Sequence, residues 1–264
     1  MVTEFAAAKI NLSLRVTGRR SDGYHLLDSV VAFADVGDLL TFEPADEFSL
    51  RITGPFAADL AADKDNLVMR AAHSLAAAFP GKIRRAHMTL EKNLPIASGI
   101  GGGSADAAAT LRGLCGLCAF HPPLHGLALS LGADVPVCLE SRACHMRGIG
   151  EEIEAIAGCA PRHAVLVNPG VEVSTREVFA RLVIARSPGE DWRNDLAAPA
   201  QALEPVIADV IAALRRRRGS DYVAMSGSGA TCFGIFATAQ ESAEAVESIR
   251  MTWPRWWCKA VILT

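Results

Sequence analysis

Apolar and polar residues alternate in the first strong pattern of the chain, between residues 10 and 16. The apolar positions, which would share one face of a strand, are Ile10, Leu12, Leu14 and Val16. The polar positions, which would share the other face, are Asn11, Ser13 and Arg15. A period of two is typical of a β-strand, so the pattern predicts one within residues 5–17. Lys9 would begin this strand, a place where a lysine is ordinarily solvated.

Short apolar runs and segments with helical spacing follow one another along the rest of the chain. The runs that predict strands span residues 29–34, 38–42, 48–52, 86–90, 163–167, 232–237 and 257–263. The segments that predict helices span residues 67–79, 105 to 113 or 116, 124–131, 205–218 and 241–250. A further helix should begin at Thr175, because Ser174 and Glu177 have the spacing of a capping box. Residues 147–151 predict a turn and residues 187–193 a surface loop.

The most informative stretch, residues 94–110, reads LPIASGIGGGSADAAAT. Its glycines at 99, 101, 102 and 103 allow positive φ angles and let a ligand approach the backbone closely. The alanine-rich run that follows predicts a helix, whose N-terminal N–H groups and dipole would attract an anion, most often phosphate. A plain flexible loop is the alternative, but a linker would not run straight into such a helix.

This loop matches neither common nucleotide fingerprint. Ser104 stands where a dinucleotide-binding GxGxxG motif has its last glycine. A P-loop needs Gly-Lys-Ser/Thr, and the Gly81-Lys82 pair is followed by Ile83. The sequence therefore predicts a phosphate loop of another kind.

Two other sites carry candidate chemistry. Tyr24 and His25 leave a glycine-containing turn, and their rings could either stack on a flat ligand or simply pack. Asp134 lies between a helix-ending Gly132 and Pro136, which hold the backbone firmly. A turn residue or helix N-cap is its simpler interpretation, because a catalytic base would need a cationic partner and a substrate hydroxyl.

Composition narrows the class of protein. The chain has 264 residues, 50% of them apolar and 21% charged, which suits one large or two modest domains. The net charge of −3 gives no electrostatic attraction for nucleic acid, and the basic run 215–218 is interpreted as a helix end. No apolar run approaches the ~20 residues of a membrane span, and no signal-peptide pattern is visible. Seven cysteines, an odd number, favour reduced thiols and a cytoplasmic location. Cys115 and Cys118 have no second ligand pair at the spacing of a zinc site.

Six segments together resemble the GHMP kinase superfamily, and most closely those members that phosphorylate a cytidine diphosphate-linked polyol. In chain order they read AKINLSLRVTGRRSDGYHLLDSVV, LPIASGIGGGSADAAATLRGL, LGADVPVCL, VSTREVF, NDL and MSGSGATCFGIF. The first segment is the most specific, because mevalonate and homoserine kinases share the glycine loop but not GRRxDGYHxL. Ala7 departs from the family, which usually has proline there, and residues 115–125 are also atypical.

The resemblance implies a two-domain α+β enzyme, with ATP and substrate in the cleft between the domains. The N-terminal domain, residues 1–155, would be like ribosomal protein S5 domain 2, and the C-terminal domain, residues 156–264, would be ferredoxin-like. ATP and Mg²⁺ are the implied cofactors, and the implied partner is a small molecule rather than nucleic acid or a membrane. A related kinase of mevalonate, homoserine or a sugar stays open, and so does a nucleotide-binding module without catalysis.

The resemblance also assigns residues. Lys9 and Asp134 match the catalytic positions, with Asp134 accepting the proton of the substrate hydroxyl. The loop that would wrap the phosphates comprises Pro95, Ile96, Ala97, Ser98, Gly99, Ile100, Gly101, Gly102, Gly103 and Ser104. Either Ser98 or Ser104 would approach Mg²⁺. The substrate residues would be Asn11, Tyr24, His25, Thr175 and Phe179.

Overall fold

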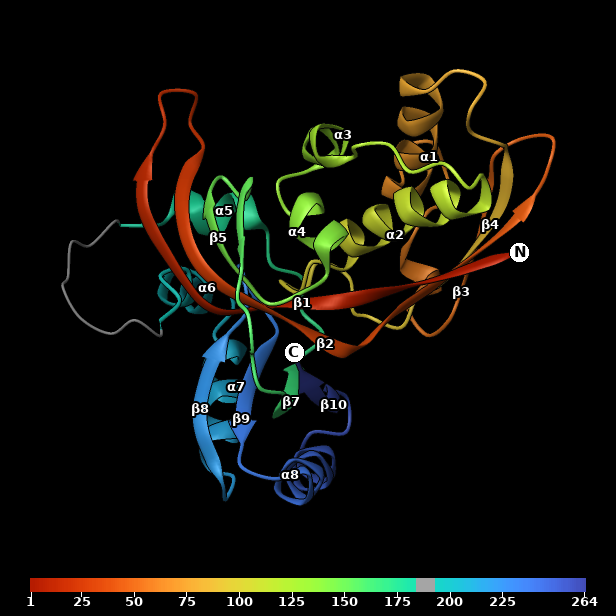
Figure 1. The fold of residues 1–264 in the computed structure, drawn as a ribbon. Helices are drawn as coiled ribbons and strands as arrows, with labels where there is room; N and C mark the ends of the chain where they lie inside the picture. The colour runs from red at the N-terminus through yellow and green to blue at the C-terminus, as the bar shows by residue number, and fades with distance from the viewer. Residues whose placement is uncertain (184–192) are drawn as a thin grey trace. The chain divides into compact units, whose positions relative to one another are not determined.

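A computed structural model describes residues 1–183 and 193–264 (Figure 1). These residues form two compact units. Unit 1 comprises residues 1–8, 36–96 and 101–141, and unit 2 comprises residues 9–35, 97–100 and 142–264. The two longest strands, β1 (Val2–Arg19) and β2 (His25–Pro44), each contribute one part to each unit. The expected domain boundary after residue 155 is a different division and stays a prediction; it falls where β6 ends.

Unit 1 contains a small sheet and four α-helices. In the sheet, β4 (Ala86–Glu91) pairs antiparallel with the C-terminal part of β2 and parallel with β3 (Ser49–Thr53). The helices are α1 (Leu67–Ala78), α2 (Gly102–Leu117), α3 (His125–Leu131) and α4 (Val135–Glu140), with a 3-10 turn, η1, at Ala57–Asp59. The long helix α2 packs against α1 and α4, so it occupies the middle of the helical layer.

Helix α2 approaches β2 closely at one point. Phe42 of β2 is fully buried, and a Cβ placed on Gly113 of α2 would lie 2.2 Å from its ring. Only glycine fits at this position. This contact holds the helix that follows the glycine loop against the sheet of unit 1.

Unit 2 is built on antiparallel strands. β5 (Cys144–Gly148) lies between the N-terminal part of β2 and β6 (Glu152–Ala155). The remaining strands follow in the order β10 (Trp257–Leu263), β7 (Arg162–Asn168), β9 (Cys232–Phe236) and β8 (Ser220–Met225), with β10 also pairing with β2. The helices are α5 (Thr175–Ala180), α6 (Ala197–Leu203), α7 (Val206–Arg215) and α8 (Ala239–Thr252).

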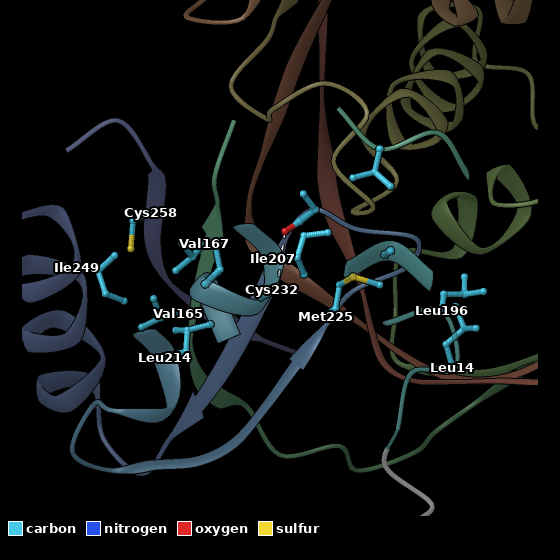
Figure 2. Packing of buried hydrophobic residues seen from close by; sticks show 14 of the residues in the cluster. Leu14, Val165, Val167, Leu196, Ile207, Leu214, Met225, Cys232, Ile249 and Cys258 are labelled. Atoms are coloured by element: carbon cyan, nitrogen blue, oxygen red, sulfur yellow. Dashed lines mark hydrogen bonds between the residues drawn. The ribbon is translucent and has the colours of Figure 1, made fainter. Parts of the chain in front are cut away.

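One continuous apolar core holds unit 2 together. Figure 2 shows its centre, where β7 presents Val165 and Val167 on one face toward side chains from α7 and α8. Ile207 and Leu214 of α7 and Ile249 of α8 are completely buried in this cluster. The apolar face predicted for the helix within residues 205–218 therefore packs into this core.

The predicted mixture of helices and strands is confirmed, and so are most element positions. Asn66 caps α1 by accepting a hydrogen bond from the Val68 N–H, and Ser174 caps α5 by accepting one from Glu177. Among the described residues no helix is long and apolar enough to cross a membrane. The seven cysteines are all free thiols, as expected.

Some predictions were incomplete. The two strands expected at 29–34 and 38–42 are one strand, β2, because the chain stays extended through Gly37, where a Cβ would lie 2.3 Å from the Ala6 carbonyl oxygen. The turn expected at 147–151 joins two unpredicted strands, β5 and β6. The short helices α4 and α6 were also not predicted. Of the surface loop expected at 187–193, only Arg193 lies within the described residues.

Candidate active site

The glycine loop has the backbone form that the sequence predicts. Gly99 and Gly101 have φ angles of 73° and 66°, in the left-handed region that favours glycine. Gly101 directly precedes α2 and supplies no side-chain cap. The first N–H groups of any helix lack an intrahelical acceptor, so those of Gly102, Gly103 and Ser104 are available to an external anion. The loop end of α2 thus presents backbone N–H donors and the positive end of a helix dipole, the groups that bind an anion at a helix N-terminus.

Residues 97–100 form the part of this loop that belongs to unit 2, and we call them the loop limb. A second tight turn, residues 226–231 or the Ser226 turn, packs against it backbone to backbone. A Cβ on Gly99 would lie 2.6 Å from the Ser226 carbonyl oxygen, and one on Gly227 would lie 2.5 Å from the Gly99 carbonyl oxygen. The Thr231 N–H donates to the Ser98 carbonyl over 3.1 Å. The small residues of the Ser226 turn are therefore required by contact with the loop limb.

The Ser226 hydroxyl joins the loop limb to strand β1. It donates to the Gly99 carbonyl over 3.0 Å and accepts the backbone N–H of Asn11 over 3.1 Å. The sequence analysis includes this turn in the family segment MSGSGATCFGIF but assigns its residues no role. The signal was present in the second Gly-Ser-Gly run, but its contact partner is far away in the chain.

In unit 1, a buried ionic cluster supports the other end of the loop. Lys92 Nζ donates to Asp38 Oδ2 over 2.5 Å and to Asp106 Oδ2 over 2.7 Å. Asp38 Oδ1 also accepts the N–H groups of Asn93 and Leu94, which lead into the loop. We call Lys92, Asp38 and Asp106 the Lys92 cluster. It ties β4 and β2 to the first turns of α2, and sequence reasoning missed it.

The Lys92 cluster contains one more carboxylate than ammonium groups. Burial lowers the pKa of Lys92, but the carboxylates of Asp106 and Asp38 outweigh it, so the pKa lies above its usual value. Burial raises the pKa of Asp106 to about 7; the Lys92 ammonium opposes this rise and the Asp38 carboxylate adds to it. Asp106 Oδ1 is buried without a hydrogen-bond partner among the described residues. Asp106 is therefore the electrostatically strained member of the cluster.

Strand β1 carries two of the predicted site residues in unit 2. Lys9 is only 3% exposed, so the solvated strand end expected of a lysine there is wrong. Its backbone N–H donates to the Ile100 carbonyl over 2.9 Å. Asn11 is held by its Nδ2, which donates to Ser29 Oγ over 2.8 Å, while its Oδ1 is buried without a partner among the described residues. Asn11 thus keeps an oriented acceptor that the protein does not use.

Asp134 lies in unit 1, immediately before α4. Asp134 occupies a turn at the N-cap position of α4, as its simpler interpretation expects, but its φ of −87° and ψ of −9° are helical and its side chain makes no capping hydrogen bond to α4. Arg112 of α2 holds the other end of α4, because its Nη1 donates to the Cys138 carbonyl over 3.0 Å. The same guanidinium donates through Nε to Glu4 Oε2 over 2.8 Å. Asp134 therefore directly precedes a helix that is tied to α2.

The structure brings together residues of the two segments expected to bind substrate. The rings of His25 and Phe179 stack with centroids 4.7 Å apart and planes at 25°. Burial, and then the charge of Arg19, lower the pKa of His25 below its usual value of 6.5. Tyr24, beside this pair, is 58% exposed, so its ring does not simply pack in the core. Thr175, at the start of α5, shares a 2.8 Å hydrogen bond with Ser228 of the Ser226 turn.

Comparisons with known proteins identify the family. Residues 66–142 match the GHMP kinases N terminal domain, and residues 184–255 match the GHMP kinases C terminal domain. A protein of Cereibacter sphaeroides (strain ATCC 17025 / ATH 2.4.3) named 4-diphosphocytidyl-2-C-methyl-D-erythritol kinase is 50% identical, with 97% of each chain covered. A protein of Rhizobium etli (strain CIAT 652) with the same name is also 50% identical, covering 98% of this chain and 94% of that protein.

Solved structures give the same result. A crystal structure of 4-(cytidine 5'-diphospho)-2C-methyl-D-erythritol kinase is similar with a TM-score of 0.83 and 34% identity, covering 98% of both chains. Homoserine kinase from Cytophaga hutchinsonii shares the fold with a TM-score of 0.67 at 15% identity, covering 100% of this chain and 94% of that one. The expected α+β architecture of GHMP kinases is confirmed, and the protein is an ATP-dependent small-molecule kinase. The chain belongs to the 4-diphosphocytidyl-2-C-methyl-D-erythritol kinase family of the GHMP kinases.

Proposed function

We propose that the protein transfers the γ-phosphoryl group of ATP to the 2-hydroxyl of 4-diphosphocytidyl-2-C-methyl-D-erythritol, in the non-mevalonate route to isoprenoid precursors. The observation that carries this proposal is the stacked pair of His25 and Phe179 beside the exposed ring of Tyr24. His25 and Tyr24 lie in the segment that mevalonate and homoserine kinases do not share. The full-length similarity to relatives of that name supports the same substrate. The free thiols support a cytoplasmic location.

ATP would be held by residues 95–104. The N–H groups at the start of α2 would bind phosphate oxygens, and glycine there leaves no Cβ in their way. Among the described residues, no group of three or more His, Cys, Asp or Glu side chains could hold a metal ion. Mg²⁺ would enter with the nucleotide and neutralise charge on its phosphates, as it does in many kinase sites. Ser104, half-buried on the first turn of α2, is a better candidate for contact with that ion than Ser98, which is 4% exposed.

Asp134 would accept the proton of the substrate hydroxyl as its oxygen bonds to the γ-phosphorus and the bond to the ADP oxygen breaks. The Lys9 ammonium would stabilise the negative charge that develops on the attacking oxygen. Phosphoryl transfer depends mainly on positioning and electrostatics. The hydrogen bonds that hold α4 to Arg112 and β1 to Ile100 therefore favour these assignments.

The cytosine ring would stack on the aromatic residues, and His25 would read its edge. The lowered pKa keeps His25 neutral at pH 7, so one ring nitrogen can accept and the other can donate a hydrogen bond. Asn11 Oδ1 and the Thr175 hydroxyl would bind polar groups of the substrate. Asn11 is well suited, because its carboxamide orientation is already set by Ser29.

The direct test is ³¹P NMR of the purified protein with ATP, Mg²⁺ and the diphosphocytidyl substrate. Mevalonate and homoserine, in separate tubes, are the controls. We expect a new phosphomonoester resonance with the diphosphocytidyl substrate alone. A product from mevalonate or homoserine instead would assign the protein to a different small-molecule kinase activity.

A further inference from the structure

The Asn194-Asp195-Leu196 segment matches the family motif but has no part in the site described so far. Its backbone runs beside β1: the Leu14 N–H donates to the Arg193 carbonyl over 2.7 Å, and the Asp195 N–H donates to the Leu14 carbonyl over 2.9 Å. The Leu196 side chain is buried next to Leu14, as Figure 2 shows. The segment is therefore anchored on both sides of Asn194.

The Asn194 carboxamide uses all of its hydrogen-bonding groups. Nδ2 donates to the Met225 carbonyl over 2.7 Å and to the Gly227 carbonyl over 2.8 Å. Oδ1 accepts the N–H of Leu196 over 2.9 Å, which fixes the orientation of the amide plane. The two carbonyls belong to the residues on either side of Ser226. One side chain thus holds both flanks of the Ser226 turn.

Ser226 in turn connects this turn to the loop limb and to strand β1. Its hydroxyl lies between the Asn11 N–H and the Gly99 carbonyl, and the Gly99–Gly227 contact leaves no space between the turn and the loop limb. A shift of the Ser226 turn would therefore move residues 97–100. The contacts run from Asn194 through Ser226 to the loop limb, all within unit 2.

We propose that Asn194 is a positioning residue for the phosphate site: its carboxamide sets the Ser226 turn, and the turn sets the loop limb. This inference rests on the proposed role of residues 95–104 in ATP binding. Asparagine meets the requirement because its single Nδ2 carries two donors while its Oδ1 remains an acceptor. Aspartate has the same shape, but it would place a carboxylate against two carbonyl oxygens.

The test compares Asn194→Asp with Asp195→Asn. Asp195 accepts the Val16 N–H over 2.8 Å and pairs with Arg193, so it anchors the same segment without touching the Ser226 turn. We expect Asn194→Asp to raise the KM for ATP about tenfold or more, in the range of losing two hydrogen bonds. In Asp195→Asn we expect a lower Tm, because the ion pair with Arg193 is lost. Its ATP KM should stay within about twofold of wild type, because the remaining carbonyl still accepts from Val16.

Hydrogen exchange of the unliganded protein gives a readout that does not need activity. Peptides covering residues 97–100 and 226–231 should exchange faster in Asn194→Asp than in Asp195→Asn. Equal exchange in the two variants, with an unchanged ATP KM in an active enzyme, would overturn the inference and leave the proposed function standing. A wild-type protein that forms no phosphomonoester would contradict the proposed function, while the exchange comparison still tests Asn194.

Two further variants separate positioning from general destabilisation. Asn194→Ala removes the donors without adding charge, and it replaces Asn194→Asp if that variant does not fold. A double variant with Ser226→Ala tests the route of the effect. If Asn194 acts through Ser226, the ATP KM of the double variant should be no worse than that of the more impaired single variant. Fully additive losses would mean that the two residues act separately, which contradicts the inference.

Discussion

The backbone N–H of Lys9 donates a 2.9 Å hydrogen bond to the carbonyl of Ile100. The strand that carries the proposed catalytic lysine is therefore tied directly to the loop limb of the proposed ATP site. Asn11, two residues further along the strand, is tied to the same limb through Ser226. These bonds fix the backbone of both elements before any ligand binds, which is the preorganisation that electrostatic catalysis requires.

Asp134→Ala should abolish nearly all turnover, by about 10²–10⁴-fold in kcat, because the proton acceptor is lost. The fold should survive, since Asp134 lies half-buried in the turn before α4 rather than in the core. Steady-state kinetics, ATP binding by calorimetry and circular dichroism together check this outcome. Asp134→Asn, which keeps the shape of the side chain, should be similarly inactive. Wild-type-like turnover in either variant would rule out the proposed role of Asp134.

Tyr24→Ala should raise the KM for the cytidine substrate roughly 5- to 100-fold, the range expected for loss of one base-stacking ring. The KM for ATP should change far less. Because Tyr24 is 58% exposed, the free energy of unfolding should stay within about 0.5 kcal/mol of wild type. Initial rates with each substrate varied in turn give the comparison. Tyr24→Phe, which keeps the ring, is the matched control, and an unchanged substrate KM in Tyr24→Ala would count against stacking.

Gly99→Ala and Gly81→Ala form a pair that separates backbone strain from close packing. Their φ angles are nearly equal, 73° and 72°, but a Cβ on Gly81 meets nothing within 4 Å. Gly81→Ala should cost only the strain of a left-handed alanine, about 1–2 kcal/mol. Gly99→Ala should cost more, because its Cβ would lie 2.6 Å from the Ser226 carbonyl oxygen.

Thermal unfolding and the ATP KM of the two alanine variants check this expectation. Only Gly99→Ala should weaken ATP binding, since it alone displaces the loop limb from the Ser226 turn. If both variants lost the same stability and bound ATP equally well, the packing argument would fail.

Asp106 should make stability depend on pH. Its pKa is about 7 in the folded protein against an ordinary value of 3.8, so the folded state keeps a proton that the unfolded state has lost. The stabilisation from this group is full below about pH 4 and disappears as the pH rises through about 7. Between pH 5 and pH 8 the wild type should therefore lose about 2 kcal/mol that Asp106→Asn does not lose. Urea unfolding at the two pH values measures the difference.

The control for Asp106→Asn is Glu91→Gln, which removes an exposed carboxylate from the end of β4. This variant should keep the wild-type change of stability with pH. An Asp106→Asn protein whose stability followed the wild-type pH dependence would show that Asp106 ionises normally despite its burial.

The sequence predicted those features whose cause is local. Alternation revealed β1, helical spacing revealed α1, and the capping box marked the start of α5. Long-range contacts could not be predicted in this way. Lys92 and Asp38 are 54 positions apart in the sequence, and Asn194 and Gly227 are 33 positions apart. No local sequence pattern indicates that these residues contact each other. The helix α4 is missing from the prediction because six residues are too few for a periodic signal.

The position of β10 in the sheet also constrains the order in which the protein folds during synthesis. Thr264, just after this strand, exchanges two 2.9 Å backbone hydrogen bonds with Phe33, and β10 lies between β2 and β7. During synthesis, β2 and β7 leave the ribosome long before β10. The edges of β2 and β7 that pair with β10 therefore remain unpaired until β10 has been made. The central part of this sheet can close only after residue 264 has emerged, and the edges of β2 and β7 that face β10 stay exposed until then.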